Sequence, residues 1–186
     1  MKKTLVLSCA LALAALSNAA LAADGAAGFV RAEIGNSDTE ISVDGFSDSD
    51  SDTSVGFGGG YWFNANIGVE GHFAVLYNTE LDDNTELDLV SLGVGVVGKK
   101  NFGANGTGFF IGGRAGIARM TAQVREDDFD VVDDESSIKP YYGVNVGYDF
   151  NENWGLSLNY DRRQGDFDGG VDVDVDTVSV GGEWRF

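Results

Sequence analysis

Several residue types are scarce in this 186-residue chain, and each scarcity excludes a class of protein. There is one cysteine (Cys9), one proline and one histidine. Cys9 lies in a segment that we expect to be removed, so the mature chain has no disulfide framework and no thiolate metal site. Basic residues are also few, with 12 Lys and Arg against 30 Asp and Glu and a formal net charge of −18. Such an acidic chain is a poor partner for nucleic acid.

Long apolar runs are also missing, apart from a short one near the amino terminus. Lys2 and Lys3 precede an apolar segment, residues 4–16, that is shorter than the ~20 residues a membrane helix needs. Ala20 and Ala22 then supply the small residues of a cleavage site. We expect residues 1–22 to be a secretory signal peptide that is removed, leaving 23–186 as one domain. Any membrane spanning by the mature chain must then use strands.

The chain does contain 27 glycines and many segments in which apolar and polar residues alternate, as half-buried strands do. The final segment shows the pattern best, with Val178, Val180, Gly182, Trp184 and Phe186 on one face. Outer-membrane barrels close with such a strand, its apolar face toward lipid and its polar face toward the lumen. We expect Val178, Val180, Trp184 and Phe186 to form the carboxyl-terminal signal read by the barrel-assembly machinery.

The alternation extends through the whole mature chain. It predicts strands at Gly28–Gly35, Val55–Phe63, Ile67–Asn78, Asp88–Lys99, Gly108–Val124, Lys139–Phe150, Trp154–Gln164 and Asp174–Phe186. Short polar turns alternate with long acidic loops, which are expected at Asn36–Ser54, Thr79–Leu87, Arg125–Ile138 and Gly165–Val173. Aromatic residues gather at both ends of the apolar faces, as membrane interfaces require. The predicted fold class is all-β, an eight-stranded antiparallel up-and-down transmembrane β-barrel in the cell outer membrane.

The acidic loops carry most of the negative charge. Asp48, Asp50 and Asp52 follow the opening spacing of a calcium loop, but the glycine and the closing glutamate of that motif are missing. They are therefore weak candidates for a divalent-cation site, and we otherwise assign no metal and no cofactor. Divalent ions held by the loops could bridge to lipopolysaccharide phosphates. Repulsive, solvated surface is the simpler interpretation.

The opposite parity of the strands predicts the lumen. It contains a balanced charge network, comprising Arg31, Glu33, Glu70, His72, Arg114, Asp161, Arg163 and Glu183, with Lys99, Asp149 and Arg185 nearer the periplasmic mouth. An eight-stranded barrel has room for side chains and little else. We expect a salt-bridge plug, and the alternative is a narrow pore in which Arg114 or Arg163 exchanges carboxylate partners. His72 is expected beside Glu70 as a hydrogen-bonded filler, with no nucleophile required by the spacing, so we predict no enzyme.

Toward the acidic loops the hydrophobic parity inverts. Asp88, Asp174 and Asp176 share the outward faces, which leaves a set of apolar residues inward: Leu76, Leu87, Leu89, Met120, Ala122, Val124, Val171, Val173 and Val175. We expect the strands to project beyond the bilayer around a small apolar cluster. That cluster is a structural cap or, alternatively, a pocket for a small apolar ligand.

Two stretches carry a family resemblance. Val55–Glu70 and Val146–Leu156 both show a glycine-rich or aromatic strand, an Asn turn and a second strand. Together with the Trp184-Arg185-Phe186 end, they make the mature chain resemble the OmpA/OmpX-type outer-membrane β-barrels. The resemblance implies an eight-stranded barrel, with adhesion or resistance to host defence in some members. No segment resembles a peptidoglycan-binding domain, so we expect no cell-wall tether.

The sequence therefore predicts an integral outer-membrane protein, monomeric and surrounded by lipid and lipopolysaccharide. Its role is structural, supporting membrane integrity, or an adhesin-like surface interaction through long acidic extracellular loops. The alternative is a narrow pore or transporter for small solutes or small apolar ligands.

Overall fold

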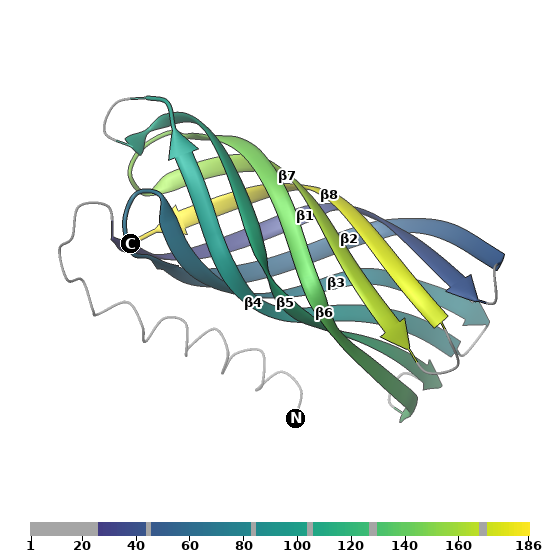
Figure 1. The fold of residues 1–186 in the computed structure, drawn as a ribbon. Coiled ribbons are helices and arrows are strands. Elements are labelled where there is room, and N and C mark those ends of the chain that lie inside the picture. The colour runs from purple at the N-terminus through teal and green to yellow at the C-terminus, as the bar shows by residue number, and fades with distance from the viewer. Residues whose placement is uncertain (1–25, 44–45, 83–84, 104–105, 127–129, 168–170) are drawn as a thin grey trace.

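The computed structural model describes residues 26–43, 46–82, 85–103, 106–126, 130–167 and 171–186. They form a closed barrel in which each strand pairs antiparallel with the next and β8 pairs with β1 (Figure 1). The strands are β1 (Ala27–Val43), β2 (Phe46–Trp62), β3 (Ile67–Asp82), β4 (Thr85–Asn101), β5 (Gly108–Glu126), β6 (Asp130–Asp149), β7 (Trp154–Phe167) and β8 (Val171–Arg185). The predicted fold class is confirmed. No helix in the described part of the chain is long and apolar enough to cross a membrane.

The predicted boundaries are wrong at one end of the barrel. Most of the segments predicted as long loops are strand, since β1 continues to Val43 and β2 begins at Phe46. Their outward residues are not apolar, which is why the sequence pattern indicates loops, but a strand outside a bilayer needs no outward apolar face. The strands run to 14–20 residues, whereas ~9–11 suffice to span a membrane. The extra length forms an extended mouth, called here the loop end.

The opposite end, called here the turn end, is closed by tight turns with a shared chemistry. The side-chain oxygens of Asn64 and Asn151 each accept two backbone N–H groups at 2.8–3.0 Å, those of the residues two and three positions later. The second Asn of each turn, Asn66 or Asn153, donates to a carbonyl of the adjacent strand at 2.9 Å. The N-x-N spacing therefore both bends the chain and ties the turn to its neighbour.

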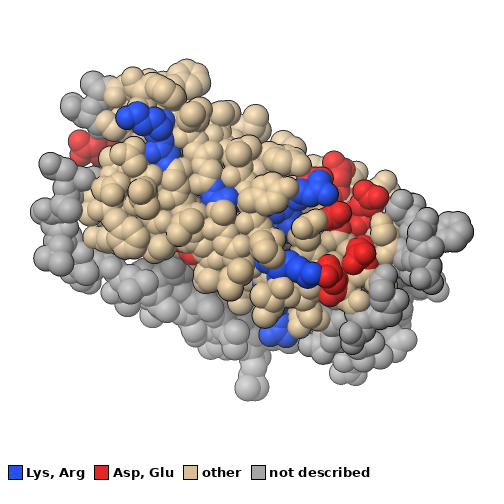
Figure 2. Space-filling model, viewed as in Figure 1, with Lys and Arg blue, Asp and Glu red and all other residues tan. Residues whose placement is uncertain are grey.

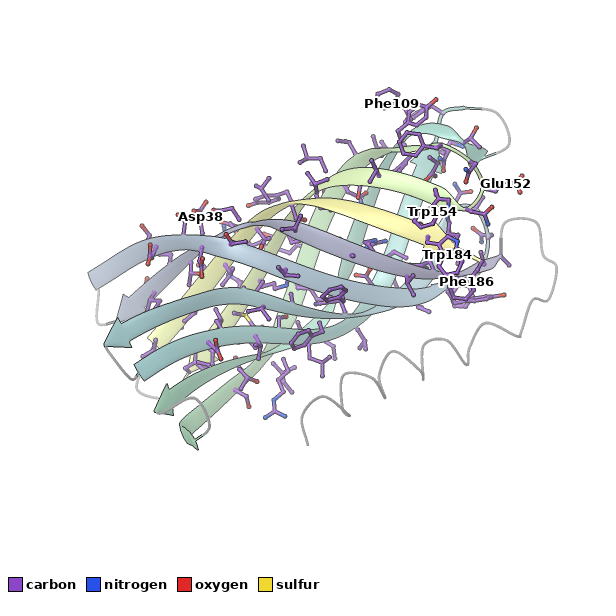
Figure 3. All side chains as sticks on the ribbon, turned by 180° about the vertical axis from the view of Figure 1, so that it is seen from behind. Asp38, Phe109, Glu152, Trp154, Trp184 and Phe186 are labelled. Carbon is purple, nitrogen blue, oxygen red and sulfur yellow. The ribbon has the colours of Figure 1, made fainter. Side chains whose placement is uncertain are left out.

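The outer surface between the two ends is an apolar belt. Phe57, Leu92, Phe109 and Val144 are each more than 60% exposed, which in water would be a large unfavourable patch. Figure 2 shows this band as mostly uncharged, with acidic side chains gathered at the loop end. In Figure 3 Phe109, Trp154, Trp184 and Phe186 lie at the turn end, and Asp38 lies toward the other. The belt has the position that lipid contact requires.

Two seams divide the loop end. The ladder between β2 and β3 stops at Val55 and Val75, and the ladder between β6 and β7 stops at Tyr141 and Arg163. Every other neighbouring pair continues its ladder to the loop end of the described strands, with register shifts between β3 and β4 and between β5 and β6. At the loop end the barrel wall is therefore divided into two four-stranded sheets, β7-β8-β1-β2 and β3-β4-β5-β6. Pro140 adjoins the second seam, and it has no N–H with which to continue a ladder.

Candidate functional site in the barrel interior

The middle of the lumen is crossed by ion pairs that join distant strands. Arg31 on β1 donates to Glu70 on β3 at 3.0 Å and to Glu183 on β8 at 2.8 Å. Each of these side chains is mostly buried, with 7% of Arg31 and 1% of Glu70 exposed. Parity places all three inward, as predicted. A charge in this position is tolerable because its partners neutralise it.

A second arginine extends the network to the other side of the barrel. Arg114 on β5 donates through both terminal nitrogens to Glu33 on β1, at 3.0 and 2.9 Å, and through Nε to Asp161 on β7 at 2.5 Å. Arg31 also lies 3.9 Å from Glu33, so the two clusters are continuous. Bidentate arginine–carboxylate geometry is the strongest form of such a contact. Five of the eight strands are thereby connected through the centre.

A further charged layer lies toward the turn end. Asp149 accepts from Lys99 at 3.0 Å and from Arg185 at 2.5 Å. Glu183 lies 3.7 Å from Lys99 and 3.4 Å from Arg185, so it connects this layer to Arg31. Lys99 and Arg185, predicted near the periplasmic mouth, have side chains that are only 7–8% exposed.

Buried aromatic rings cover the charged layer at the turn end, and these rings were not predicted as part of the lumen site. Phe29, Trp62 and Val97 form a small apolar cluster, and the ammonium of Lys99 lies 4.9 Å from the Trp62 ring centroid. Tyr141, 1% exposed, donates to Glu70 at 2.9 Å. The alternation that identified the charged lumen residues also places these aromatic residues inward, so parity was the signal for them.

His72 lies in the lumen beside Glu70, as predicted, with Nδ1 4.0 Å from the carboxylate. Its ring packs edge-on against Tyr141, with centroids 4.6 Å apart. Neither ring nitrogen, nor the hydroxyl of Ser91, has a hydrogen-bond partner in the described part of the chain. The expectation that His72 is a hydrogen-bonded filler is therefore wrong, because the ring is held by packing. No Ser91–His72 pair is formed.

Arg163 is buried in the lumen as predicted but stands apart from the network. It donates to Thr177 at 3.5 Å, and Thr177 in turn shares a hydrogen bond with Ser37. No carboxylate lies within 4.0 Å of Arg163 among the side chains that the structure describes. The predicted alternative, in which Arg114 or Arg163 exchanges carboxylate partners, has no support at Arg163, and Asp161 is held by Arg114.

The predicted inner apolar cluster is present at the loop end, although the side chains of Leu87 and Val124, also predicted for it, lie outside the described residues. It consists of Ala74, Leu76, Leu89, Met120, Val173 and Val175, with Ala122, Phe167 and Val171 packed against it. Leu76, Met120 and Val175 have no exposed surface. Two cavities in the described part of the barrel are small, with room for roughly two water molecules and roughly one.

The acidic residues of the loop end depart from the sequence analysis in two ways. Asp88, expected on an outward face, is 5% exposed; a β-bulge at Val75/Tyr77 on the paired strand β3 shifts the register beside it. Asp50 and Asp52 lie on a strand rather than a loop, and the side chain of Asp48 lies outside the described residues. Within those residues no group of three or more His, Cys, Asp or Glu could hold a metal ion, so the cation site stays a prediction.

The closing strand has the predicted orientation. Val178, Val180 and Trp184 are 42–54% exposed on the outer face, and Trp184 stacks on Trp154 with centroids 6.0 Å apart. Phe186 and Gly28 exchange two backbone hydrogen bonds of 2.9–3.0 Å, which closes β8 onto β1. The role of these residues in assembly stays a prediction, as does the signal peptide, which lies outside the described residues.

Comparisons with known proteins agree with this architecture. A family model described as "Outer membrane protein beta-barrel domain" matches residues 8–186. The chain belongs to this family. It is therefore an outer-membrane protein in contact with membrane lipid, from a family of small barrels that are not enzymes. No curated protein sequence matches the chain.

Solved structures with the same fold are distant in sequence. Neisserial surface protein A has a TM-score of 0.68 at 19% identity, covering 88% of this chain and 100% of its own. Ail, the attachment invasion locus protein of Yersinia pestis, solved in complex with the heparin analogue sucrose octasulfate, has a TM-score of 0.57 at 20% identity, covering 86% and 99%. OprG from Pseudomonas aeruginosa has a TM-score of 0.58 at 16% identity, covering 86% and 96%.

Proposed function

We propose that this barrel is a non-conducting scaffold that holds a protein-binding surface above the outer membrane. The observation that carries the proposal is the continuous ion network from Arg31 to Arg114, which joins five strands through the centre of the lumen. Moving one arginine aside would leave buried carboxylates unpaired, at a cost of several kcal/mol. Opening a path for solutes would require breaking these ion pairs at that cost in free energy. A scaffold, in contrast, is made more rigid by the same ion pairs.

The loop end supplies the surface. Its strands continue beyond the apolar belt, and many of their outward residues are acidic, such as Asp38, Glu40 and Asp172. A protein that served membrane integrity alone would not need this length. The names of two structural relatives, a surface protein and an attachment protein, are consistent with contact at the cell surface.

Conductance tests the proposal directly. The refolded barrel, checked for folding by its shifted electrophoretic mobility, is expected to give no discrete conductance in a planar bilayer. Arg114→Ala and the exposed control Arg119→Ala should both be silent, because the aromatic and apolar layers above and below the network remain. A steady conductance of the unaltered barrel that Arg114→Ala changes would overturn the scaffold and support the narrow pore or transporter.

A polyanion should not bind at the loop end. Two exposed cations there are already engaged with carboxylates: Arg162 lies 3.3 Å from Asp174 and 3.2 Å from Asp176, and Lys139 pairs with Asp166. With a net charge of −18, the protein is expected to repel sucrose octasulfate. Calorimetric titration should show no saturable binding at physiological salt. Saturable binding by the unaltered barrel would contradict this prediction.

A further inference from the structure

The upper part of β2 has one edge without a ladder. Over Phe46–Ser54 the strand pairs with β1 on one side, while its pairing with β3 begins only at Val55. The N–H of Phe63 donates to the carbonyl oxygen of Ile67 across the turn, so it points toward β3. The register between β1 and β2 has no shift over the whole length of β2. Because amides alternate in direction along a strand, the N–H groups of Ser51 and Thr53 also turn toward the β3 side.

Those two amides are occupied by carboxylates of their own strand. The N–H of Ser51 donates to Asp50 at 2.8 Å, and the N–H of Thr53 donates to Asp52 at 2.6 Å. Asp50 and Asp52 stand opposite Thr39 and Ser37 of β1, so both lie on the inward face of the mouth. Charged groups placed on a strand edge prevent indiscriminate pairing with other chains.

The chain's own neighbours are unsuited to this edge. The part of β3 across the seam carries Glu80 and Asp82, and like charges across a strand pair are destabilising. A second copy of this acidic chain would meet the same repulsion. The other seam is already bridged, because the N–H of Asp166 donates to Ser137 at 3.0 Å and Asp166 pairs with Lys139.

We propose that the edge of β2 over Phe46–Ser54 accepts an extended polypeptide with basic residues at alternate positions, added antiparallel to β2 in the place that β3 leaves. Asp50 and Asp52 are two residues apart on one face, a spacing of about 6.6–6.8 Å that alternate residues of a partner strand reproduce. The partner's cations draw the carboxylates from the amides of Ser51 and Thr53, which then donate to the partner's backbone carbonyls. This proposal rests on the loop end being the interaction surface.

Three isomeric or modified peptides test the proposal on the full chain folded in lipid nanodiscs. The first alternates Lys and Thr, the second has the same composition with its lysines in one block, and the third is the alternating peptide methylated on alternate backbone nitrogens. By fluorescence anisotropy at physiological salt, the alternating peptide should bind at least about fivefold more tightly than the block isomer, as two added cross-strand ion pairs would give. Backbone methylation should abolish that preference. Amide exchange should slow at Ser51 and Thr53 when the alternating peptide is bound.

Matched variants locate the site. Asp50→Asn with Asp52→Asn keeps the side-chain oxygens that hold the amides but removes their charge, and should weaken binding by about fivefold. Asp174→Asn with Asp176→Asn removes two carboxylates with the same spacing from β8, which is paired on both sides, and should change binding little. Equal binding of all three peptides, or an effect of the β8 variant alone, would overturn the proposal. A silent barrel that binds no peptide would overturn this inference and leave the scaffold standing, whereas conductance by the unaltered barrel would overturn the scaffold itself.

Discussion

Replacing Arg114 with alanine is expected to lower the free energy of unfolding by about 3–5 kcal/mol, because it leaves buried carboxylates without their cation. Asp161 would lose its ion-pair partner, and Glu33 would keep only the 3.9 Å contact with Arg31. Urea unfolding of the barrel in lipid vesicles, followed by tryptophan fluorescence, measures the change. The variant should still fold, since the strand registers do not depend on this side chain.

Arg119 provides the matched control, because it lies on the same strand but faces outward. It is exposed and donates to Ser136 at 2.9 Å, so Arg119→Ala should change the unfolding free energy by no more than about 0.5 kcal/mol. Adding Glu33→Gln and Asp161→Asn to Arg114→Met should recover much of the loss, because the unpaired charges are then gone. If Arg114→Ala and Arg119→Ala were equally mild, the ion network would not be what stabilises the barrel interior.

Strand parity is what made the lumen predictable from the sequence. A period of two divides residues between lipid and lumen, so Arg31, Glu70 and Arg114 could be placed inward without a structure. Their pairing could not be predicted in the same way. Which carboxylate meets Arg114 depends on how far each strand is staggered around the barrel, and that stagger comes from the closed set of registers.

The loop end was less predictable because the outward faces of its strands carry no apolar signal. Asp50 and Asp52 alternate with serine and threonine, and ordinary strand propensity disfavours aspartate. The ladder between β2 and β1 is nevertheless complete. Two strands joined by a short connection can pair in water without an outward apolar face. The seams depend on local irregularities, the bulge at Val75/Tyr77 and the proline at position 140. Of these, Pro140 was visible in the sequence but was not interpreted as the end of a ladder.

Adding one methyl group at Gly116 is expected to cost about 3 kcal/mol or more, at the upper end of overpacking effects. A Cβ there would lie 2.1 Å from the Val94 carbonyl oxygen and 2.6 Å from the Gly95 Cα, with the Tyr141 ring at 2.8 Å. The first two contacts are backbone atoms of β4, so no side-chain rotation relieves them. The close approach of β4 and β5 allows Tyr141 to lie over the two glycines and reach Glu70.

The direction of the change in stability on Gly116→Ala distinguishes a steric effect of packing from an effect of strand propensity. Glycine is a poor strand former, so alanine would ordinarily be neutral or stabilising at such a position. Gly56→Ala is the matched control: it also faces the lumen, but its added Cβ would meet Glu33 and Ala74 at 3.6–3.8 Å, which is ordinary contact. Gly56→Ala should therefore fold with unchanged or slightly raised stability, while Gly116→Ala should shift the urea midpoint downward or fail to show the mobility shift of a folded barrel. Equal stability of the two variants would mean that β4 and β5 can separate at little cost, and that the position of Tyr141 does not depend on their close approach.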